Sequence, residues 1–239
     1  GYSEFFLREQ ELKNIMKKLL MPMLTIAFIG TLSCTYSSDS NDRTSEAGTA
    51  SNQRGTQSLA SEAQTKYLKD IAGEVQIQTD TVNITSENRT YKAYIASPTE
   101  DGKYPAIVLI HSFRGFEPGY QQMVDRTASN GYVVIAPFWQ TYSQSPSDAE
   151  VETLIRSAVE YLEKREDVDS EKLGLTGFCA GGRYTMLFLP QIKDFNSGIA
   201  WYGFPYTGGT ESQPEKPASL ISQLDTPMLV IHGTRDQLS

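Results

Sequence analysis

The stretch Gly177-Phe178-Cys179-Ala180-Gly181 constrains the fold of this chain more than any other part of the sequence. It follows the short apolar run 172–176 and precedes a stretch that is compatible with a helix, so it predicts a sharp turn from a strand into a helix. A nucleophile at the centre of such a turn needs small residues on both sides, because the chain crowds itself there. The turn also ends at a helix N-terminus, where free backbone N–H groups stabilise a thiolate or an oxyanion. Cys179 is therefore a candidate nucleophile.

The alternative for Cys179 is a small buried hydrophobic residue, which is what most free cysteines are. The wider run Gly177-Phe178-Cys179-Ala180-Gly181-Gly182-Arg183 resembles the dienelactone hydrolase family, and the similarity extends from about Tyr94 to Ser239. This resemblance implies an α/β-hydrolase fold, with a mostly parallel sheet flanked by helices, and a Cys–Asp–His triad. It also implies a small-molecule ester or lactone as the substrate, and it implies no metal or organic cofactor.

Composition narrows the classes of partner. The 239 residues are 39% hydrophobic, which fits one sizeable domain plus some unfolded length. The net charge of −8 argues against nucleic acid, because phosphate binding needs a basic surface. The two cysteines, Cys34 and Cys179, lie in very different settings, so no disulfide is indicated. Oligomeric state is not indicated by the sequence.

The N-terminal part of the chain predicts export. Residues 1–15 are interpreted as upstream sequence or an expression remnant. Residues 16–33 combine a basic start with a short apolar run, which is typical of a bacterial signal peptide; the alternative is an ordinary buried helix. Thr31-Leu32-Ser33-Cys34 resembles a lipobox, which predicts a lipid on Cys34 that anchors the protein to the membrane in the cell envelope or periplasm.

A polar stretch separates this signal from the folded part. Residues 34–64 are rich in Ser, Thr, Asn, Asp and Gly, and such a segment buries too little apolar surface to offset its ordering entropy. We therefore expect a disordered tether over 34–64 and a folded domain over 65–239. The domain is expected to be C-terminally incomplete, with the last strand and helix of the fold missing.

The folded part alternates strand and helix patterns, which is typical of an α/β fold. Two antiparallel edge strands are expected at 74–79 and 90–96. Buried strands are expected at 105–110, 132–137, 172–176, 197–202 and 227–232, and helices at 120–129, at 148–162 and from the elbow to about Pro190. Ser147 and Glu150 have the spacing of a capping box at the start of the second helix.

The acid of the implied triad is assigned to Asp236, in His232-Gly233-Thr234-Arg235-Asp236. The order in this fold is nucleophile, acid, base, so a catalytic histidine is expected after Asp236. The chain has only His111 and His232, and neither follows Asp236. His111 ends a predicted central strand, and we interpret it as a supporting residue rather than the base.

The oxyanion hole of this fold is built from two backbone N–H groups. The resemblance assigns them to Ala180 and, in the loop after the central strand, to Phe113. Relatives commonly carry a glutamate at the position of Ser112, where the carboxylate helps to deprotonate the thiol, and a serine is no base at neutral pH. Arg183 either pairs with a nearby carboxylate and braces the elbow, or lies on a solvated face.

Three further hypotheses stay open beside ester or lactone hydrolysis. The first is a non-catalytic, lipid-anchored binding module, which the serine at position 112 and the missing base favour. The second is a general esterase or acyl-peptide hydrolase. The third is a thiol redox role, which the absence of a second cysteine near Cys179 makes the weakest.

Overall fold

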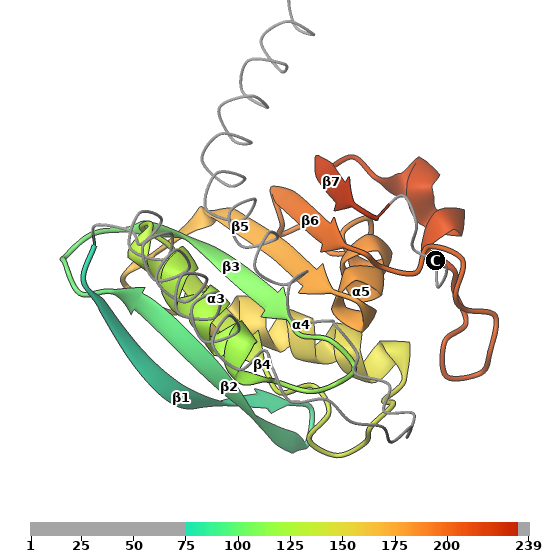
Figure 1. The fold of residues 1–239 in the computed structure, drawn as a ribbon, viewed down its shortest axis with the longest axis horizontal. Helices are drawn as coiled ribbons and strands as arrows, with labels where there is room; N and C mark the ends of the chain where they lie inside the picture. The colour runs from blue at the N-terminus through green and yellow to red at the C-terminus, as the bar shows by residue number, and fades with distance from the viewer. Residues whose placement is uncertain (1–74, 234–239) are drawn as a thin grey trace, which may run out of the picture. The chain divides into compact units, whose positions relative to one another are not determined.

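The computed structural model of the protein describes residues 75–233. These residues form one seven-stranded sheet in the order β1-β2-β4-β3-β5-β6-β7, with helices on both of its faces (Figure 1). Within this range no helix has the length and apolar character needed to cross a bilayer. The expected signal peptide, the tether with Cys34 and the triad acid Asp236 all fall outside the described residues.

The elements follow one another along the chain as an antiparallel hairpin and then alternating helices and parallel strands. In chain order they are β1 (Ile77–Ser86), β2 (Arg89–Pro98), β3 (Tyr104–Ile110), α3 (Pro118–Ser129), β4 (Val133–Pro137), α4 (Asp148–Glu163), β5 (Val168–Phe178), α5 (Ala180–Phe188), β6 (Ser197–Trp201), the 3₁₀ helix η1 (Pro217–Gln223) and β7 (Met228–Ile231).

The parallel strands form the core of the sheet. β3 lies between β4 and β5, and the parallel pairing continues through β6 to β7. Ile107, Val108 and Leu109 of β3 are at most 2% exposed, as the continuous apolar run of a strand covered on both faces predicts. Because these five strands run the same way, their carboxyl ends meet at one edge of the sheet, where open α/β sheets place their sites.

The first strand differs from the expected one. A strand was expected at 74–79, whereas β1 begins at Ile77 and continues to Ser86, where the two residues Glu87 and Asn88 turn the chain into β2. Most of β1 is exposed, so its side chains are polar and carry little of the hydrophobic alternation by which strands are recognised. The second expected strand is not an edge strand, since β2 pairs with both β1 and β4.

The helices cover the two faces of the sheet unequally. α3 lies on one face, over β2 and β4, while α4 and α5 lie on the other (Figure 1). α3 ends at Ser129, as expected for the helix at 120–129, and Gly131 follows with a φ of 87°, which favours the end of a helix.

The capping box expected at α4 is present. The Glu150 N–H donates to Ser147 Oγ at 3.3 Å, and the Ser147 N–H donates to Glu150 Oε2 at 2.9 Å. A serine at this position satisfies an N–H group that the helix leaves unpaired. We therefore expect Ser147→Ala to lower the free energy of unfolding by about 1 kcal/mol, measured by urea denaturation. Ser157→Ala, an exchange on the same helix away from its start, serves as the control and should cost clearly less.

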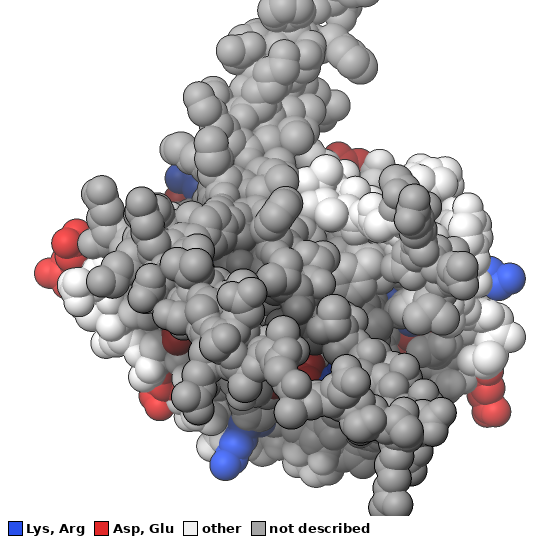
Figure 2. Space-filling model, in the orientation of Figure 1, with Lys and Arg blue, Asp and Glu red and all other residues white. Residues whose placement is uncertain are grey.

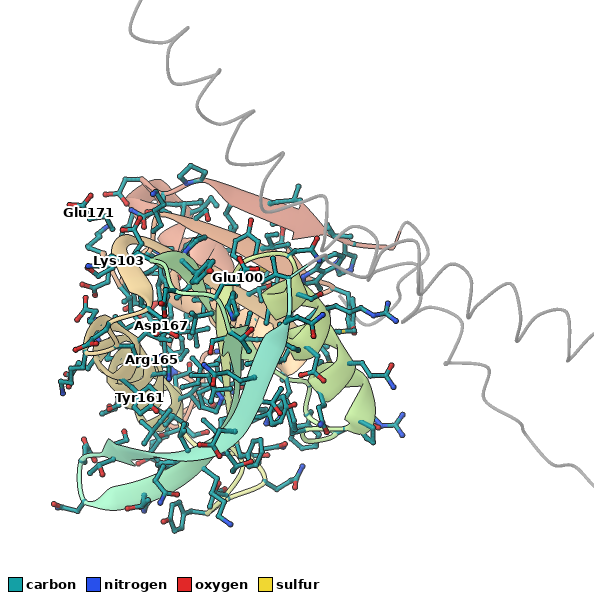
Figure 3. The ribbon with its side chains drawn as sticks, turned by 90° about the vertical axis from the view of Figure 1, so that its left-hand side faces the viewer. Glu100, Lys103, Tyr161, Arg165, Asp167 and Glu171 are labelled. Carbon is teal, nitrogen blue, oxygen red and sulfur yellow. The ribbon has the colours of Figure 1, made fainter. Side chains whose placement is uncertain are left out.

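One group of charged side chains lies at the amino ends of the parallel strands. Arg165 pairs with Asp167 at 2.6 Å just before β5, and these residues lie with Lys103 at the amino ends of β3 and β5 (Figure 3). On the face drawn in Figure 2, the coloured basic side chains are scattered singly and form no continuous patch among the described residues.

Candidate active site

Cys179 lies at the turn between β5 and α5, as the sequence predicts. Its backbone has φ 56° and ψ −112°, a conformation that residues with a side chain rarely adopt. Its N–H donates to the carbonyl of Trp201 at 3.0 Å, and its own carbonyl accepts from the Arg183 N–H at 3.0 Å. The free thiol is half-buried. A strained backbone that presents a nucleophile at a helix start is the geometry of a nucleophile elbow.

Glycines allow this turn to be so tight. A Cβ atom on Gly177 would lie 2.2 Å from the Gly181 carbonyl oxygen, and one on Gly181 would lie 2.0 Å from the Ile110 carbonyl oxygen. Both distances are far below van der Waals contact, and the atoms met are backbone. The first turn of α5 is thus pressed directly against the end of β3, which brings the elbow next to the loop that follows Ile110.

That loop, residues 111–115, is held by side chains from two other parts of the chain, α3 and the loop after β4. The His111 carbonyl accepts from the indole Nε1–H of Trp139 at 3.2 Å, and the Ser112 N–H donates to the Tyr120 hydroxyl at 3.2 Å. The Phe113 carbonyl accepts from the amides of Gln140 and Gln144 at 2.8 and 2.9 Å.

The loop also holds itself. The Ser112 carbonyl accepts from His111 Nδ1–H at 2.8 Å and from the Gly115 N–H at 3.1 Å, while the Arg114 N–H donates to Ser112 Oγ at 3.2 Å. The Phe113 N–H, by contrast, has no acceptor among residues 75–233.

The N–H of Ala180 also lacks a hydrogen-bond acceptor within the described residues. It belongs to the first residue of α5, whose N–H has no partner within the helix, and no acceptor for it lies in the described part of the chain. The two N–H groups that the sequence assigns to an oxyanion hole thus have no acceptor among residues 75–233, and neither have those of Gly181 and Gly182 in the same turn of α5. Phe113 is exposed and Ala180 half-buried, so both N–H groups are open to water or to a ligand oxygen.

His111 is not placed as a general base. Its ring is 1% exposed and stacks on Trp139 at 5.3 Å, and its Nδ1–H is used on the Ser112 carbonyl. Burial lowers the pKa of His111 to about 4, because the charged imidazolium is poorly solvated there. The supporting role expected for His111 from the sequence stays a prediction. His232, the other histidine, is exposed directly after β7.

The buried neutral His111 predicts a loss of stability in acid. The unfolded imidazole takes up a proton near pH 6.5, whereas the folded one does so only near pH 4, so unfolding binds a proton between these values. Stability therefore falls as the pH drops from 6.5 toward 4, by up to about 3 kcal/mol. Chemical denaturation at pH 7, 5.5 and 4.5 measures it, with His111→Asn as the comparison. Equal pH slopes for both proteins would contradict the assignment.

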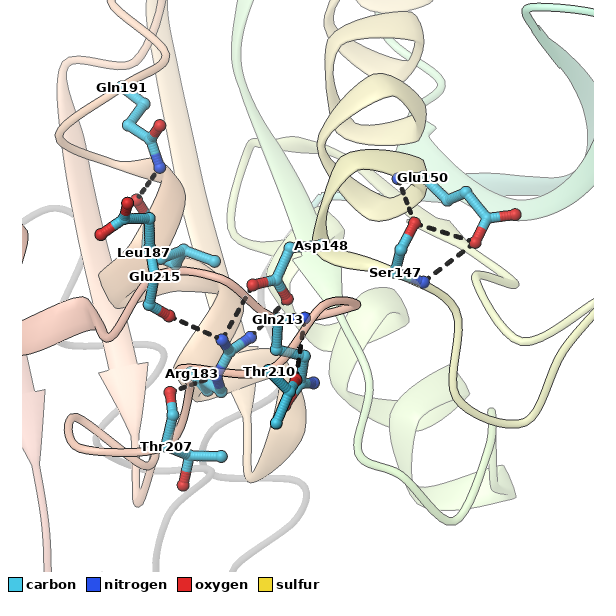
Figure 4. Close-up of polar contacts among 10 residues, drawn as sticks. All are labelled: Ser147, Asp148, Glu150, Arg183, Leu187, Gln191, Thr207, Thr210, Gln213 and Glu215. Atoms are coloured by element: carbon cyan, nitrogen blue, oxygen red, sulfur yellow. Dashed lines mark hydrogen bonds and ion pairs between the residues drawn. The ribbon is translucent and has the colours of Figure 1, made fainter.

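Arg183 forms a buried ion pair, which was one of the two arrangements expected for it. Its guanidinium binds both carboxylate oxygens of Asp148, at 2.6 and 2.9 Å, and the two side chains are 3% and 7% exposed. The same guanidinium donates to the carbonyls of Thr207 and Glu215, each at 3.1 Å (Figure 4). It thus ties the first turn of α5 to the start of α4 and to the loop after β6.

Several of these residues have no signal in the sequence. Tyr120, Gln140 and Gln144 hold the loop at 111–115 through contacts between segments far apart in the chain, and their residue types are common on ordinary surfaces. Asp148 lies in the first turn of α4, where an acidic residue is already expected because it interacts favourably with the helix dipole. Its pairing with Arg183 is therefore not evident from the sequence. Trp139, shortly after β4, and Trp201, the last residue of β6, are core residues, 2% and 1% exposed.

The sheet order, the helices on both faces and the elbow at the end of β5 define an α/β-hydrolase. The model of the dienelactone hydrolase family matches this chain over residues 91–155 and 138–239. Because these matches cover more than half of the chain, the protein belongs to the dienelactone hydrolase family, as the motif around Cys179 indicates.

Curated relatives agree with this family. The chain is 28% identical over 194 residues to a provisionally named carboxymethylenebutenolidase of Methylorubrum extorquens, which covers 71% of this chain and 67% of the relative. It is 27% identical over 171 residues to a provisionally named carboxymethylenebutenolidase of Escherichia coli, covering 64% and 63%. A Bradyrhizobium relative, provisionally named a 2-oxo-3-(5-oxofuran-2-ylidene)propanoate lactonase, is 28% identical over 176 residues, covering 67% and 71%. The chain thus spans slightly less than two thirds of the E. coli relative.

Solved structures show the same fold. A dienelactone hydrolase, provisionally so named, from Klebsiella pneumoniae superposes with a TM-score of 0.64 at 24% identity, covering 68% of this chain and 75% of that one. An acylaminoacyl peptidase from Pyrococcus horikoshii superposes with a TM-score of 0.56 at 20% identity, covering 66% and 32%. At these identities the likeness concerns the fold.

Proposed function

We propose that this protein hydrolyses carboxylic esters or lactones with Cys179 as the nucleophile. The observation that carries the proposal is a thiol on a strained turn at the start of α5, next to a loop whose Phe113 N–H, like the Ala180 N–H, has no acceptor among residues 75–233. Two fixed donors next to a nucleophile suit the oxygen of a tetrahedral intermediate, whose negative charge develops only during the reaction. The family membership and the names of the relatives support the same reaction type.

The proposed reaction has two stages. In the first, Cys179 Sγ bonds to the substrate carbonyl carbon while the thiol proton passes to a base. The π electron pair of the carbonyl moves onto its oxygen, and this oxyanion accepts hydrogen bonds from the Phe113 and Ala180 N–H groups. Collapse of this intermediate breaks the bond to the alcohol oxygen, which receives the proton from the base. In the second stage water attacks the thioester, which releases the acid and restores the thiol.

Asp236 is the proposed triad acid, and it lies outside the described residues. Its place after β7 follows from the resemblance and from the chain order of this fold. The base it would orient is a histidine after it in the full-length protein, because His111 is turned into the core. Activation of the thiol in this site also differs from the glutamate route, since Ser112 Oγ accepts from the Arg114 N–H and is only 6% exposed.

The second candidate is a binding module that has this fold without the chemistry. The serine at position 112 favours it, because no carboxylate is there to deprotonate the thiol. The two candidates differ in turnover. We expect the full-length protein to hydrolyse p-nitrophenyl acetate and dihydrocoumarin with many turnovers per molecule. Saturable binding of dihydrocoumarin without turnover, measured by calorimetry, would instead support the binding module.

We also propose that the protein is exported and anchored through a lipid on Cys34. The basic and apolar pattern of residues 16–33 supports this, and Cys34 itself lies outside the described residues. Residues 34–64 would then link the lipid to the hydrolase domain. Mass spectrometry of the protein from native membranes tests the proposal. An N-terminal peptide that begins with a diacylated Cys34 is expected, and an unmodified Cys34 in an intact chain would contradict it.

A further inference from the structure

The peptide between Ser112 and Phe113 carries the donor that the proposed oxyanion hole needs. A peptide unit is planar, and in the trans form its C=O and N–H point in opposite directions. No cis peptide occurs among the described residues. Whatever fixes the direction of the Ser112 carbonyl therefore also fixes the direction of the Phe113 N–H.

His111 fixes that carbonyl. Its Nδ1–H donates to the Ser112 oxygen at 2.8 Å, a shorter contact than the 3.1 Å from the Gly115 N–H to the same oxygen. The Gly115 bond closes the turn that contains Phe113 and moves with it. The bond from His111 is different, because the imidazole belongs to the buried core.

The imidazole has little freedom to move. Beside the stacked indole of Trp139, the rings of Phe116 and Tyr120 lie with their centres 6.1 Å from its own. A ring packed in this way holds its donor in one direction, and side chains locked by packing are what keeps a catalytic group in place. The acceptor at Nδ1 also selects the tautomer that carries its proton there.

We propose that His111 is a positioning residue of the oxyanion hole: its Nδ1–H holds the Ser112 carbonyl on the core side, so that the Phe113 N–H faces the substrate oxygen above Cys179. The imidazole contacts neither the thiol nor the substrate and acts only through the peptide plane. The inference rests on the proposed hydrolysis and adds a residue to it.

Two substitutions separate this role from simple packing. The amide nitrogen of an asparagine is as many bonds from Cβ as Nδ1 of a histidine, whereas that of a glutamine is one bond further. His111→Asn is therefore expected to keep the bond and to retain kcat within about 5-fold, whereas His111→Gln misplaces it and loses about 10²-fold in kcat with little change in KM. Leu162→Ala, a core change in α4, is the control for lost stability without a change in the loop.

The readouts are chosen to report the oxyanion. Hydrolysis of p-nitrophenyl acetate and inhibition by a trifluoromethyl ketone both build a negative oxygen, and both should weaken in His111→Gln by the same factor. Alkylation of Cys179 by iodoacetamide builds none, and its rate should match the wild type in both variants. Wild-type kcat in His111→Gln, or alkylation that slows in parallel with hydrolysis, would overturn the inference. Absence of hydrolysis in the wild type would instead overturn the proposed function.

A measurement on the wild-type protein covers the case in which His111→Gln does not fold. The nitrogen NMR spectrum of histidine-labelled protein at pH 7 should show His111 as the neutral tautomer with its proton on Nδ1. A proton on Nε2 would remove the donor to the Ser112 carbonyl and would overturn the inference.

Discussion

Cys179→Ala is expected to lower ester hydrolysis by about 10³-fold or more without unfolding the protein. The thiol is the only proposed bond-forming group, and loss of a nucleophile leaves only the contributions of binding and of the oxyanion hole. Steady-state kinetics with p-nitrophenyl acetate measures the loss. Retention of more than about a tenth of the activity would show that another residue forms the bond.

Cys179→Gly completes this experiment, because it removes the thiol and the strain together. At φ 56° and ψ −112° a Cβ atom is unfavourable, and alanine keeps it whereas glycine does not. Cys179→Gly is therefore expected to be more stable than Cys179→Ala by about 1 kcal/mol, while both are equally inactive. Equal stability of the two variants would mean that the turn stores no strain.

Arg183→Leu is expected to lower the free energy of unfolding by about 3–5 kcal/mol. The substitution leaves the Asp148 carboxylate, 7% exposed, without its partner in the interior, and the penalty of such an uncompensated charge exceeds what the ion pair itself contributes. The Thr207 and Glu215 carbonyls lose a donor at the same time. Urea denaturation monitored by tryptophan fluorescence gives the change.

Two further variants locate the origin of that loss. Adding Asp148→Asn to Arg183→Leu removes the buried charge and should restore part of the stability, but not the part that comes from the two carbonyls. Arg156→Leu, whose pair with Glu152 is on the surface with Arg156 44% exposed, should cost less than about 1 kcal/mol. A loss in Arg183→Leu no larger than in Arg156→Leu would contradict the role given to the buried pair.

The site was predictable where one short segment encodes it. The elbow is such a case, since Gly177, Cys179 and Gly181 lie within five residues and each residue type has a local reason. The buried strand β3 and the capping box of α4 were predicted for the same reason. Long apolar runs and caps depend on near neighbours, so composition at fixed spacing suffices to find them.

The rest depends on contacts that the sequence does not express. Only the start of β1 was predicted, because an exposed edge strand has little of the apolar alternation by which a strand is recognised. The hydrogen bonds from Gln140 and Gln144 to the Phe113 carbonyl join two loops that follow different strands. The sequence of neither loop predicts contact with the other. The sequence left open whether Arg183 pairs with a carboxylate or faces solvent, because its pairing with Asp148 depends on the tertiary structure.

The most direct test of the account is the mass of the protein caught during turnover. The full-length protein is mixed with excess p-nitrophenyl acetate, quenched in acid within the first turnovers and digested. The account predicts an added acetyl group on the peptide that contains Cys179, and none in Cys179→Ala. An acetyl group on a different residue, or steady hydrolysis by Cys179→Ala with no adduct, would contradict the claim that Cys179 is the nucleophile.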